Sequence, residues 1–353
     1  MRQVAAILSL ACAVGVIALV TFRSFRSGAE VMGLSLHQPA QGCRIAVLIA
    51  GTVRRVNLNA DRHLLQPLTK ANCKVDVFLS LFAGVSKGWK KASDAFEQEP
   101  DFESLNRFGI ESVIQRRFSM PGSKVVRSKI FEEHNKEPQD IAFIDRDAFW
   151  PGKGSLGEAA RSNFLMMWKE LEELWYQAQS EEHQHGSYSF VMILRDDAYW
   201  FQDFNLTKVL DMGGRERLPG NGQAGLLYSM FCDKDRQFGG DSSGIIDYVF
   251  LMDRAGAEVF CKSYSRLVWP ALFGRKWFTD YENNNAGDGS EHFYLSLAEH
   301  SGIQVIEVPL YLIPMQRVGR LHGKLCLHKY CDAKIASKNI PYFHPDMPLC
   351  KEN

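Results

Sequence analysis

The chain has 353 residues, of which 46% are hydrophobic and 23% are charged, and its 41 Lys and Arg residues balance 41 Asp and Glu residues. This composition is ordinary for a folded protein, and the length suits one large domain or two closely packed halves. The balanced charge gives no sign of a nucleic-acid partner or of a polybasic membrane surface, so any anionic ligand must be recognised by locally placed side chains.

The first predicted element is an uncharged apolar run, Val4–Phe22. As a helix it would span about 28 Å, enough to cross a bilayer once. It is longer than the apolar core of a cleaved signal peptide, and Thr21-Phe22-Arg23 is a poor cleavage context. We therefore predict a cytoplasmic tail over residues 1–3, a signal-anchor over residues 4–22 and a stem over residues 23–42. A cleaved signal peptide and a buried soluble helix are the alternatives.

The cysteines bear on the compartment of residues 43–353. Cys43 and Cys73 bracket the first predicted strand–helix unit. Three more crowd the C-terminus: Cys326, Cys331 and Cys350. This arrangement suits disulfides in an oxidising lumen, where Asn205-Leu206-Thr207 would be a glycosylation acceptor. Because Cys12 lies in the predicted anchor, an odd number of the eight cysteines remains, and at least one is free or pairs with another chain.

Strands and helices alternate at the start of the predicted lumenal domain. Arg44–Ala50 is a short apolar run that ends at Gly51, as buried parallel strands do. A helical stretch over Asp61–Ala71 follows, with Pro67 able to kink it, and Val75–Phe82 is the next strand. A strand, a helix and a strand within about 40 residues form a right-handed crossover unit, which predicts an α/β fold.

A polar, turn-rich stretch over Lys87–Gly157 gives weak strand signals at Ser112–Phe118 and Ile141–Ile144. The best helix is Glu158–Gln179, which leads into a buried strand at Tyr188–Leu194. One face of that helix gathers its apolar side chains: Phe164, Trp168, Leu171, Trp175 and Ala178.

The last part of the chain continues this pattern. Strand signals are found over three stretches: Ala224–Phe231, Ile245–Met252 and Ile303–Ile313, the last predicted strand. Asp253 can cap a helix over Arg254–Leu267. Ser290 can cap another that ends near Ser301, with Gly302 just beyond it.

Ligands of open α/β sheets lie beyond the carboxyl ends of strands, where loops diverge. The first such loop is Gly51-Thr52-Val53-Arg54-Arg55. Gly51 permits a close backbone approach, Thr52 can hydrogen-bond, and Arg54 or Arg55 can clamp a phosphate. The loop has a single glycine and is not a phosphate-cradling Gly-rich loop, so a turn with solvated arginines is the alternative.

The second loop begins with Arg195-Asp196-Asp197, at the end of Tyr188–Leu194. Adjacent carboxylates repel each other unless a cation or a hydrogen-bond donor compensates. Hard oxygen ligands suit Mg²⁺ or Mn²⁺, which in turn bridge diphosphate oxygens. Arg195 could instead neutralise one carboxylate as a structural ion pair, and the residues alone leave both interpretations open.

The order of these parts resembles the GT-A class of nucleotide-sugar-dependent glycosyltransferases. The matching parts are an anchor and stem, then Arg44–Arg55 as strand, glycine and arginine, then Tyr188–Asp197 as strand and acidic motif. More narrowly, the chain is similar to a set of eukaryotic anchored proteins with Arg-x-Asp in place of Asp-x-Asp, in which Asp197 matches the last aspartate. The resemblance covers Arg44–Leu325 and implies a GT-A-like (Rossmann-like) mixed, mainly parallel sheet flanked by helices.

The resemblance also implies roles for single residues. Asp197 would ligate Mn²⁺ or Mg²⁺, or the donor ribose, and the cation would act as a Lewis acid on the leaving nucleoside diphosphate. Some GT-A-like enzymes work without a metal, so both modes stay open. The donor would be bound by a set of six residues: Gly51, Thr52, Arg54, Arg195, Asp196 and Asp197. A carboxylate across the cleft would take the proton of the acceptor hydroxyl, and the candidates are Glu291, Asp241 and Asp247.

A histidine near the C-terminus is a second candidate metal ligand. GT-A enzymes often supply a late histidine to the catalytic cation, which the resemblance places at His322. The pattern His322-x3-Cys326-x-His328-x2-Cys331 also has ligand types that suit zinc, with disulfides through Cys326 and Cys331 as the alternative. An exposed histidine without a ligand role is the remaining interpretation of His322.

These observations predict a single-pass type II glycoprotein of the Golgi or endoplasmic reticulum membrane. Its lumenal domain would be a hexosyl- or pentosyltransferase that moves a sugar from a nucleotide-sugar donor to a glycan, protein or lipid acceptor, with no nucleic-acid partner. A non-catalytic carbohydrate-binding or scaffolding ectodomain of the same fold is the main alternative. A metal-dependent phosphate-ester hydrolase is a third, but the sequence offers it no dedicated nucleophile or dinuclear ligand set.

Overall fold

The computed structural model describes a defined part of the chain: residues 42–53, 56, 58–83, 105–132, 158–216, 225–230, 245, 248–268, 290–309, 311–321 and 324–327. The chain divides into two compact units, Met1–Gln38 and Pro39–Asn353, and all described residues lie in the second. The predicted anchor over residues 4–22 therefore lies outside them. Within the described ranges, no helix is both long enough and apolar enough to cross a membrane.

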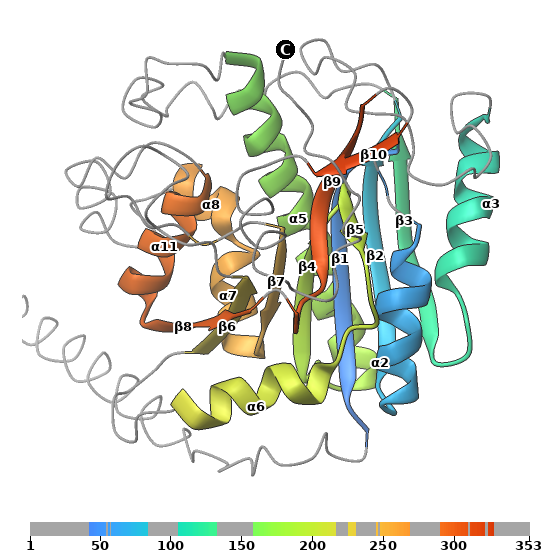
Figure 1. Ribbon diagram of the computed structural model, residues 1–353. Helices are drawn as coiled ribbons and strands as arrows, with labels where there is room; N and C mark the ends of the chain where they lie inside the picture. The colour runs from blue at the N-terminus through green and yellow to red at the C-terminus, as the bar shows by residue number, and fades with distance from the viewer. Residues whose placement is uncertain are drawn as a thin grey trace, which may run out of the picture. The chain divides into compact units, whose positions relative to one another are not determined.

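A seven-stranded mixed sheet forms the centre of the second unit (Figure 1). Its strands are β1 (Arg44–Thr52), β2 (Lys74–Phe82), β3 (Ser123–Phe131), β4 (Phe190–Arg195), β6 (Gly225–Met230), β7 (Val249–Met252) and β8 (Ile303–Val308). Their order is β3-β2-β1-β4-β7-β6-β8, and β7 runs antiparallel to both neighbours while the other pairs are parallel. This confirms the predicted mixed, mainly parallel sheet.

A small antiparallel sheet adjoins the end of β4. Its strands are β5 (Ala198–Trp200), β9 (Met315–Leu321) and β10 (Lys324–Leu327), in the order β10-β9-β5. Ala198 is paired with Arg317, and Trp200 with Met315. Because β5 begins directly after Asp197, this pairing brings a segment from the C-terminal part of the chain next to the acidic motif.

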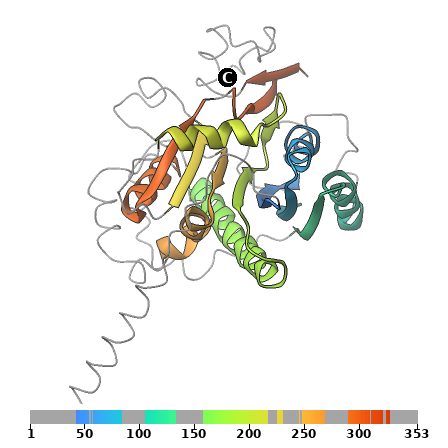
Figure 2. The same ribbon diagram turned by 90° about the horizontal axis from the view of Figure 1, so that it is seen from below.

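Helices cover both faces of the large sheet (Figure 2). One face carries the π-helix η2 (Asp61–Leu65), α2 (Gln66–Lys70), α3 (Arg107–Phe118) and α6 (Leu206–Glu216). The other carries α5 (Glu158–His185), α7 (Arg254–Phe260), α8 (Ser263–Val268) and α11 (Ser290–Ser301). Figure 2 shows α6 on one side of the strands and α5 on the other. The sheet is therefore the middle of three layers.

The side chains of β1 alternate between two apolar cores. The core on the α3 side contains Ile45, Val47 and Ile49, and the core on the α5 side contains Ala46, Leu48 and Ala50. A strand buried on both faces reads as a continuous apolar run. This is why the sequence predicts β1 and β2 to within two residues at either end.

One predicted element is wrong, and one predicted strand ends too late and is not the last. Ser112–Phe118, a weak strand signal, lies in α3, which begins after Asn106; the Asn106 side chain accepts a hydrogen bond from the Gly109 backbone N–H at 2.9 Å. This N-cap is the missed signal, and the strand of this region is β3. The predicted last strand ends at Val308 before Pro309, and β9 and β10 follow it. The predicted strand Ile141–Ile144 lies outside the described residues.

Helix-end signals in the last third are largely confirmed. The Asp253 carboxylate accepts a hydrogen bond from Gly256 N at 2.7 Å and caps α7, although the predicted single helix is divided into α7 and α8. Helix α11 begins at Ser290 itself, so Ser290 is the first helical residue and not the cap. Gly302 follows α11 with a φ of +67°, the left-handed conformation that favours glycine after a helix.

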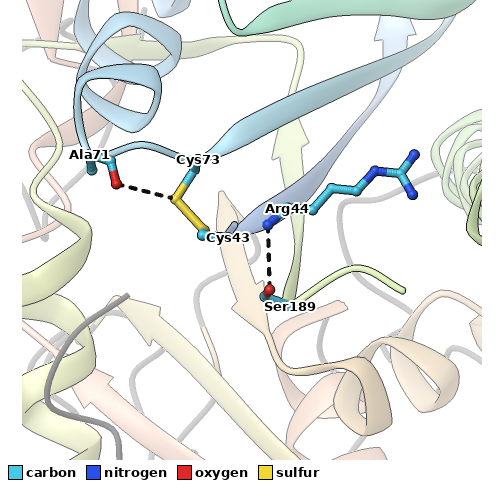
Figure 3. The surroundings of a disulfide bond; sticks show 5 residues. All are labelled: Cys43, Arg44, Ala71, Cys73 and Ser189. Atoms are coloured by element: carbon cyan, nitrogen blue, oxygen red, sulfur yellow. Dashed lines mark hydrogen bonds between the residues drawn. A yellow bond between two sulfur atoms is a disulfide. The ribbon is translucent and has the colours of Figure 1, made fainter. Parts of the chain in front are cut away.

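A disulfide between Cys43 and Cys73 joins the amino ends of β1 and β2 (Figure 3). Next to it, the Arg44 backbone N–H lies 3.4 Å from the Ser189 hydroxyl, which links β1 to the segment before β4. This confirms that the two cysteines suit a disulfide. Cys261 is a free, buried thiol, and its burial raises its pKa.

Candidate functional site

The two sequence-predicted loops leave the sheet side by side. β1 and β4 are parallel neighbours, with Ala50 paired to Arg195 at their carboxyl ends. On one side of β1 the chain proceeds to β2 and β3, and on the other to β4 and the later strands (Figure 1). This is the topological switch point of the sheet, where open α/β proteins bind ligands. The structure therefore brings the predicted residues Gly51, Thr52 and 195–197 together.

Asp196 ties the end of β1 to the turn after β4. Its Oδ2 accepts a hydrogen bond from the Thr52 backbone N–H at 2.7 Å, and the Thr52 hydroxyl lies 3.4 Å from the same oxygen. A Cβ added to Gly51 would lie only 2.2 Å from Asp196 Cγ. The sequence predicts that Gly51 lets a ligand approach the backbone closely, but the Asp196 carboxylate fills that space.

Asp197 is paired with the arginine that precedes it by two positions. Arg195 Nε donates to Asp197 Oδ1 at 2.9 Å, and Nη2 donates to Oδ2 at 3.1 Å. The Arg195 guanidinium carbon lies 5.5 Å from the centre of the Tyr248 ring, and the Arg195 backbone N–H donates to the Tyr248 carbonyl at 3.1 Å. This bidentate ion pair agrees with the second interpretation of Arg195, in which it neutralises one carboxylate structurally.

A second set of bonds holds the same two segments together further from the sheet. Asn59 Nδ2 donates to the Trp200 carbonyl at 2.8 Å, and the Trp200 backbone N–H donates to Asn59 Oδ1 at 3.3 Å. His63 Nδ1 lies 2.9 Å from Asp203 Oδ1, and the Phe204 backbone N–H donates to the His63 carbonyl at 2.8 Å. Sequence reasoning missed Asn59, because its partner lies 141 residues away and an asparagine in a loop gives no pattern of its own.

The Glu170 carboxylate, near the carboxyl ends of β2 and β3, is fully engaged. It accepts hydrogen bonds from the Ser80 hydroxyl and from Lys129 Nζ, the latter at 2.8 and 3.0 Å. Burial lowers the pKa of Lys129, but its bonds to Glu170 and Glu173 outweigh that effect and raise it. Glu170 therefore belongs to an ion-pair network between α5 and the sheet, and it is a poor candidate for a catalytic base.

The donor set of the acidic motif does not fit a divalent cation at Asp197. Both Asp197 oxygens accept hydrogen bonds from a guanidinium group, and Asp196 and Asp197 are only 3% and 4% exposed. A cation there would stand beside a fixed positive charge. No group of three or more possible metal ligands occurs among the described residues. Mn²⁺ or Mg²⁺ as a cofactor stays a prediction, as does His322 as a ligand, which lies outside the described residues.

The other predicted site residues are described only in part. Glu291 lies in the first turn of α11, as predicted, but its side chain is outside the described part of the structure. Arg54, Asp241 and Asp247 also lie outside the described residues. Their roles in donor binding and proton transfer therefore stay predictions.

Sequence comparisons find no relative: no protein-family model matches the chain, and no curated protein matches it. Among solved structures, the chain is similar to the galactosyltransferase LgtC in complex with donor and acceptor sugar analogs, with 12% identity, a TM-score of 0.35 and 74% of this chain and 72% of that chain covered. It is also similar to mouse xyloside xylosyltransferase 1, with 9% identity, a TM-score of 0.36 and coverages of 75% and 84%. The glycosyltransferase GlyE of Streptococcus pneumoniae TIGR4 gives 13% identity, a TM-score of 0.32 and coverages of 75% and 45%.

Proposed function

We propose that this protein is a glycosyltransferase that binds a nucleotide-sugar donor at the carboxyl ends of β1 and β4. The observation that supports this most directly is the bond between Thr52 N–H and Asp196, since it joins both sequence-predicted donor-binding segments at the switch point of the sheet. The order of strand, glycine and arginine, then strand and acidic motif, which resembles GT-A enzymes, supports the same reading.

In this proposal the acceptor is a glycan, protein or lipid, and the sugar is a hexose or a pentose. An acceptor oxygen forms a bond to the anomeric carbon, the bond from that carbon to the diphosphate breaks, and the nucleoside diphosphate leaves with the electron pair. The acceptor proton passes to a carboxylate, for which Glu291, Asp241 and Asp247 are the candidates. The Thr52 hydroxyl and the Arg54 guanidinium are the proposed hydrogen-bonding groups for the nucleotide sugar.

We also propose that residues 4–22 anchor the protein in the Golgi or endoplasmic reticulum membrane as a type II protein with a lumenal catalytic domain. The Cys43–Cys73 disulfide supports an oxidising compartment. The glycosylation acceptor Asn205 is exposed, and its Oδ1 accepts a hydrogen bond from the Lys208 backbone N–H at 3.0 Å. A glycan on Nδ2 would leave this helix cap intact.

A carbohydrate-binding ectodomain without catalysis is the second candidate. The observation that favours it is the bidentate pairing of the Asp197 carboxylate with Arg195, which neutralises the charge that Asp197 would need for catalysis. Such a protein would bind a sugar or nucleotide sugar and leave it unchanged.

A thermal-shift panel on the purified full chain tests the proposal. We expect either the UDP-sugars or the GDP-sugars to raise the melting temperature, because a ligand at about 100 times its Kd adds about 2.7 kcal/mol of stability. The CMP-sugars, which have a single phosphate and no diphosphate, should not. The stabilising donor should be slowly hydrolysed or transferred. Thr52→Ala should weaken its binding, whereas Thr69→Ala, on α2, should not.

Two outcomes would count against the proposal in different ways. If no nucleotide sugar stabilises the chain, the donor site at the switch point does not exist. If a donor binds but neither hydrolysis nor transfer is detected with glycan, protein and lipid acceptors, the binding ectodomain is the better description.

A further inference from the structure

The polar groups at the switch point are already committed to one another. Asp196 binds the backbone of β1 at Thr52, and Asp197 binds the guanidinium of Arg195 through both oxygens. The two aspartates are buried, and the side chains of the ion pair are 10% and 5% exposed. These four residues form what we call the strand-end latch: Thr52, Arg195, Asp196 and Asp197.

We propose that the strand-end latch positions the donor site and that the donor is bound without a divalent cation at Asp196 or Asp197. This inference rests on the proposed function, because it concerns the same nucleotide-sugar donor. Asp196 and Asp197 are then positioning residues that fix the carboxyl ends of β1 and β4. Hydrogen-bond donors and positive charges of the chain itself bind the negatively charged diphosphate of the nucleotide sugar.

The surroundings of Arg195 carry the first part of the inference. A cation bound by Asp197 would have to displace the guanidinium or share the carboxylate with it. Displacement would leave a nearly buried positive charge beside Tyr248 without its carboxylate partner, which is strongly unfavourable. Sharing would place the cation against a fixed like charge. Neither arrangement is compatible with tight metal binding by Asp197.

The surroundings of Asp196 carry the second part. Its Oδ2 satisfies the Thr52 backbone N–H, and its carboxylate fills the space over Gly51. A cation that drew this carboxylate away would leave the N–H at the end of β1 without its acceptor, and an unsatisfied backbone donor of this kind is costly. Metal binding through Oδ2 would therefore undo the geometry that joins the two loops, and Asp196 as a whole is only 3% exposed.

Donor affinity measured by calorimetry on the full chain, in EDTA and in Mn²⁺ or Mg²⁺, tests the inference. The probe is the UDP- or GDP-sugar that stabilises the protein in the thermal-shift panel. We expect dissociation constants that agree within roughly twofold in the two conditions, and no change in melting temperature with MnCl₂ alone. Donor binding that requires the cation overturns the inference and leaves the proposed function standing. A chain that binds no donor in either condition overturns the proposed function itself.

Two variants separate a positioning role from a metal ligand. Asp197→Asn should weaken donor binding by the same factor in EDTA and in Mn²⁺, whereas loss of a metal ligand would weaken it in Mn²⁺ only. Asp197→Asn can also destabilise the fold by leaving Arg195 without a charged partner. The double variant Arg195→Met/Asp197→Leu removes both charges together, and such replacements are commonly tolerated. Donor binding regained in the double variant, relative to Asp197→Asn, supports the latch. A folded double variant that binds no donor contradicts it.

Discussion

The large sheet carries one arginine–aspartate pair at the amino ends of β1 and β2 and another at the carboxyl end of β4, and the two pairs are built differently. At the amino ends, Arg44 Nε donates to Asp76 Oδ2 at 3.0 Å, and the Tyr188 hydroxyl donates to the same oxygen at 2.8 Å. Arg44 also donates to the Gly186 carbonyl and lies 4.2 Å over the Tyr188 ring. This amino-end cluster joins residues of β1 and β2 to the segment before β4, next to the Cys43–Cys73 disulfide.

At the carboxyl ends, the pair is local. Arg195 and Asp197 are two residues apart, and the link from this turn to β1 is made by the hydrogen bonds of Asp196 to Thr52. The amino-end cluster therefore cross-links distant segments, whereas the strand-end latch sets the direction of two loops at the switch point. The same residue types serve stability at one end and site geometry at the other, so the position in the sheet distinguishes the two roles.

Asp76→Ala should have the largest effect on stability. It leaves the buried Arg44 guanidinium with only the Glu181 carboxylate, whose Oε2 lies 4.0 Å from Arg44 Nη2, and breaking a close buried pair in this way costs about 3–5 kcal/mol. Urea denaturation of the two proteins measures the loss. Lys124→Ala is the matched control, because Lys124 lies 3.7 Å from Asp76 Oδ1 but is 54% exposed, and its loss should cost at most about 1 kcal/mol. Equal losses of unfolding free energy in both variants would show that the buried Arg44–Asp76 pair contributes no more to stability than an exposed ion pair does.

The double variant Cys43→Ser/Cys73→Ser should have the second-largest effect on stability. The disulfide closes a loop over 30 positions of sequence, and its removal should lower the free energy of unfolding by about 3 kcal/mol. Cys261→Ala is the control, since it removes a thiol that forms no disulfide, and we expect a cost of about 1 kcal/mol. Donor affinity of the folded double variant should be unchanged, because the bond lies at the opposite end of β1 from the latch. A donor affinity that falls with the disulfide would contradict the division of roles between the two ends.

Gly51→Ala should destabilise the fold less than the two preceding changes, but it should disturb the donor site directly. The new Cβ would lie 2.2 Å from Asp196 Cγ, so the carboxylate must turn away from Thr52 N–H. Overpacking of this kind costs about 2–3 kcal/mol, and we expect donor affinity to fall at least about tenfold. Gly109→Ala, on α3, is the control: its Cβ would lie 3.3 Å from the Leu105 side chain, and donor affinity should not change. Wild-type affinity in Gly51→Ala would refute the latch as a positioning device.

The sequence predicts the sheet better than it predicts the site, for physical reasons. Strands such as β1 are buried on both faces and appear as apolar runs, so their order and ends can be inferred from local pattern. The neighbourhood of Thr52 and Asp196 also follows, because parallel strands share one carboxyl edge. The pairing of Asp197 with Arg195 does not follow, since the same residues suit a cation or an ion pair. The bond between Asn59 and Trp200 depends on the tertiary fold alone.

Tyr188→Phe should have the smallest effect on the free energy of unfolding. The pH dependence of this effect tests how well the amino-end cluster is buried. The substitution keeps the ring, which packs edge-to-face on Phe78 with centroids 6.5 Å apart. It removes only the hydroxyl, which donates to Asp76 and accepts from Arg44 Nη2 at 3.1 Å. Loss of these two hydrogen bonds to charged groups should lower the free energy of unfolding by about 2 kcal/mol at pH 8. Urea denaturation again measures the difference.

Above pH 10 this difference should shrink. Burial and the negative charge of Asp76 raise the pKa of Tyr188 above its ordinary value of 10.0, so the folded protein holds this proton more tightly than the unfolded chain does. The stability linked to this proton is fully present below about pH 10 and is lost as the pH rises towards the folded pKa. Wild-type protein loses this contribution and Tyr188→Phe has none to lose, so the two unfolding free energies should converge as the pH rises from about 10 to about 11. A constant difference over that range would mean that the hydroxyl ionises as readily in the folded protein as in the unfolded chain, and that the amino-end cluster is open to solvent.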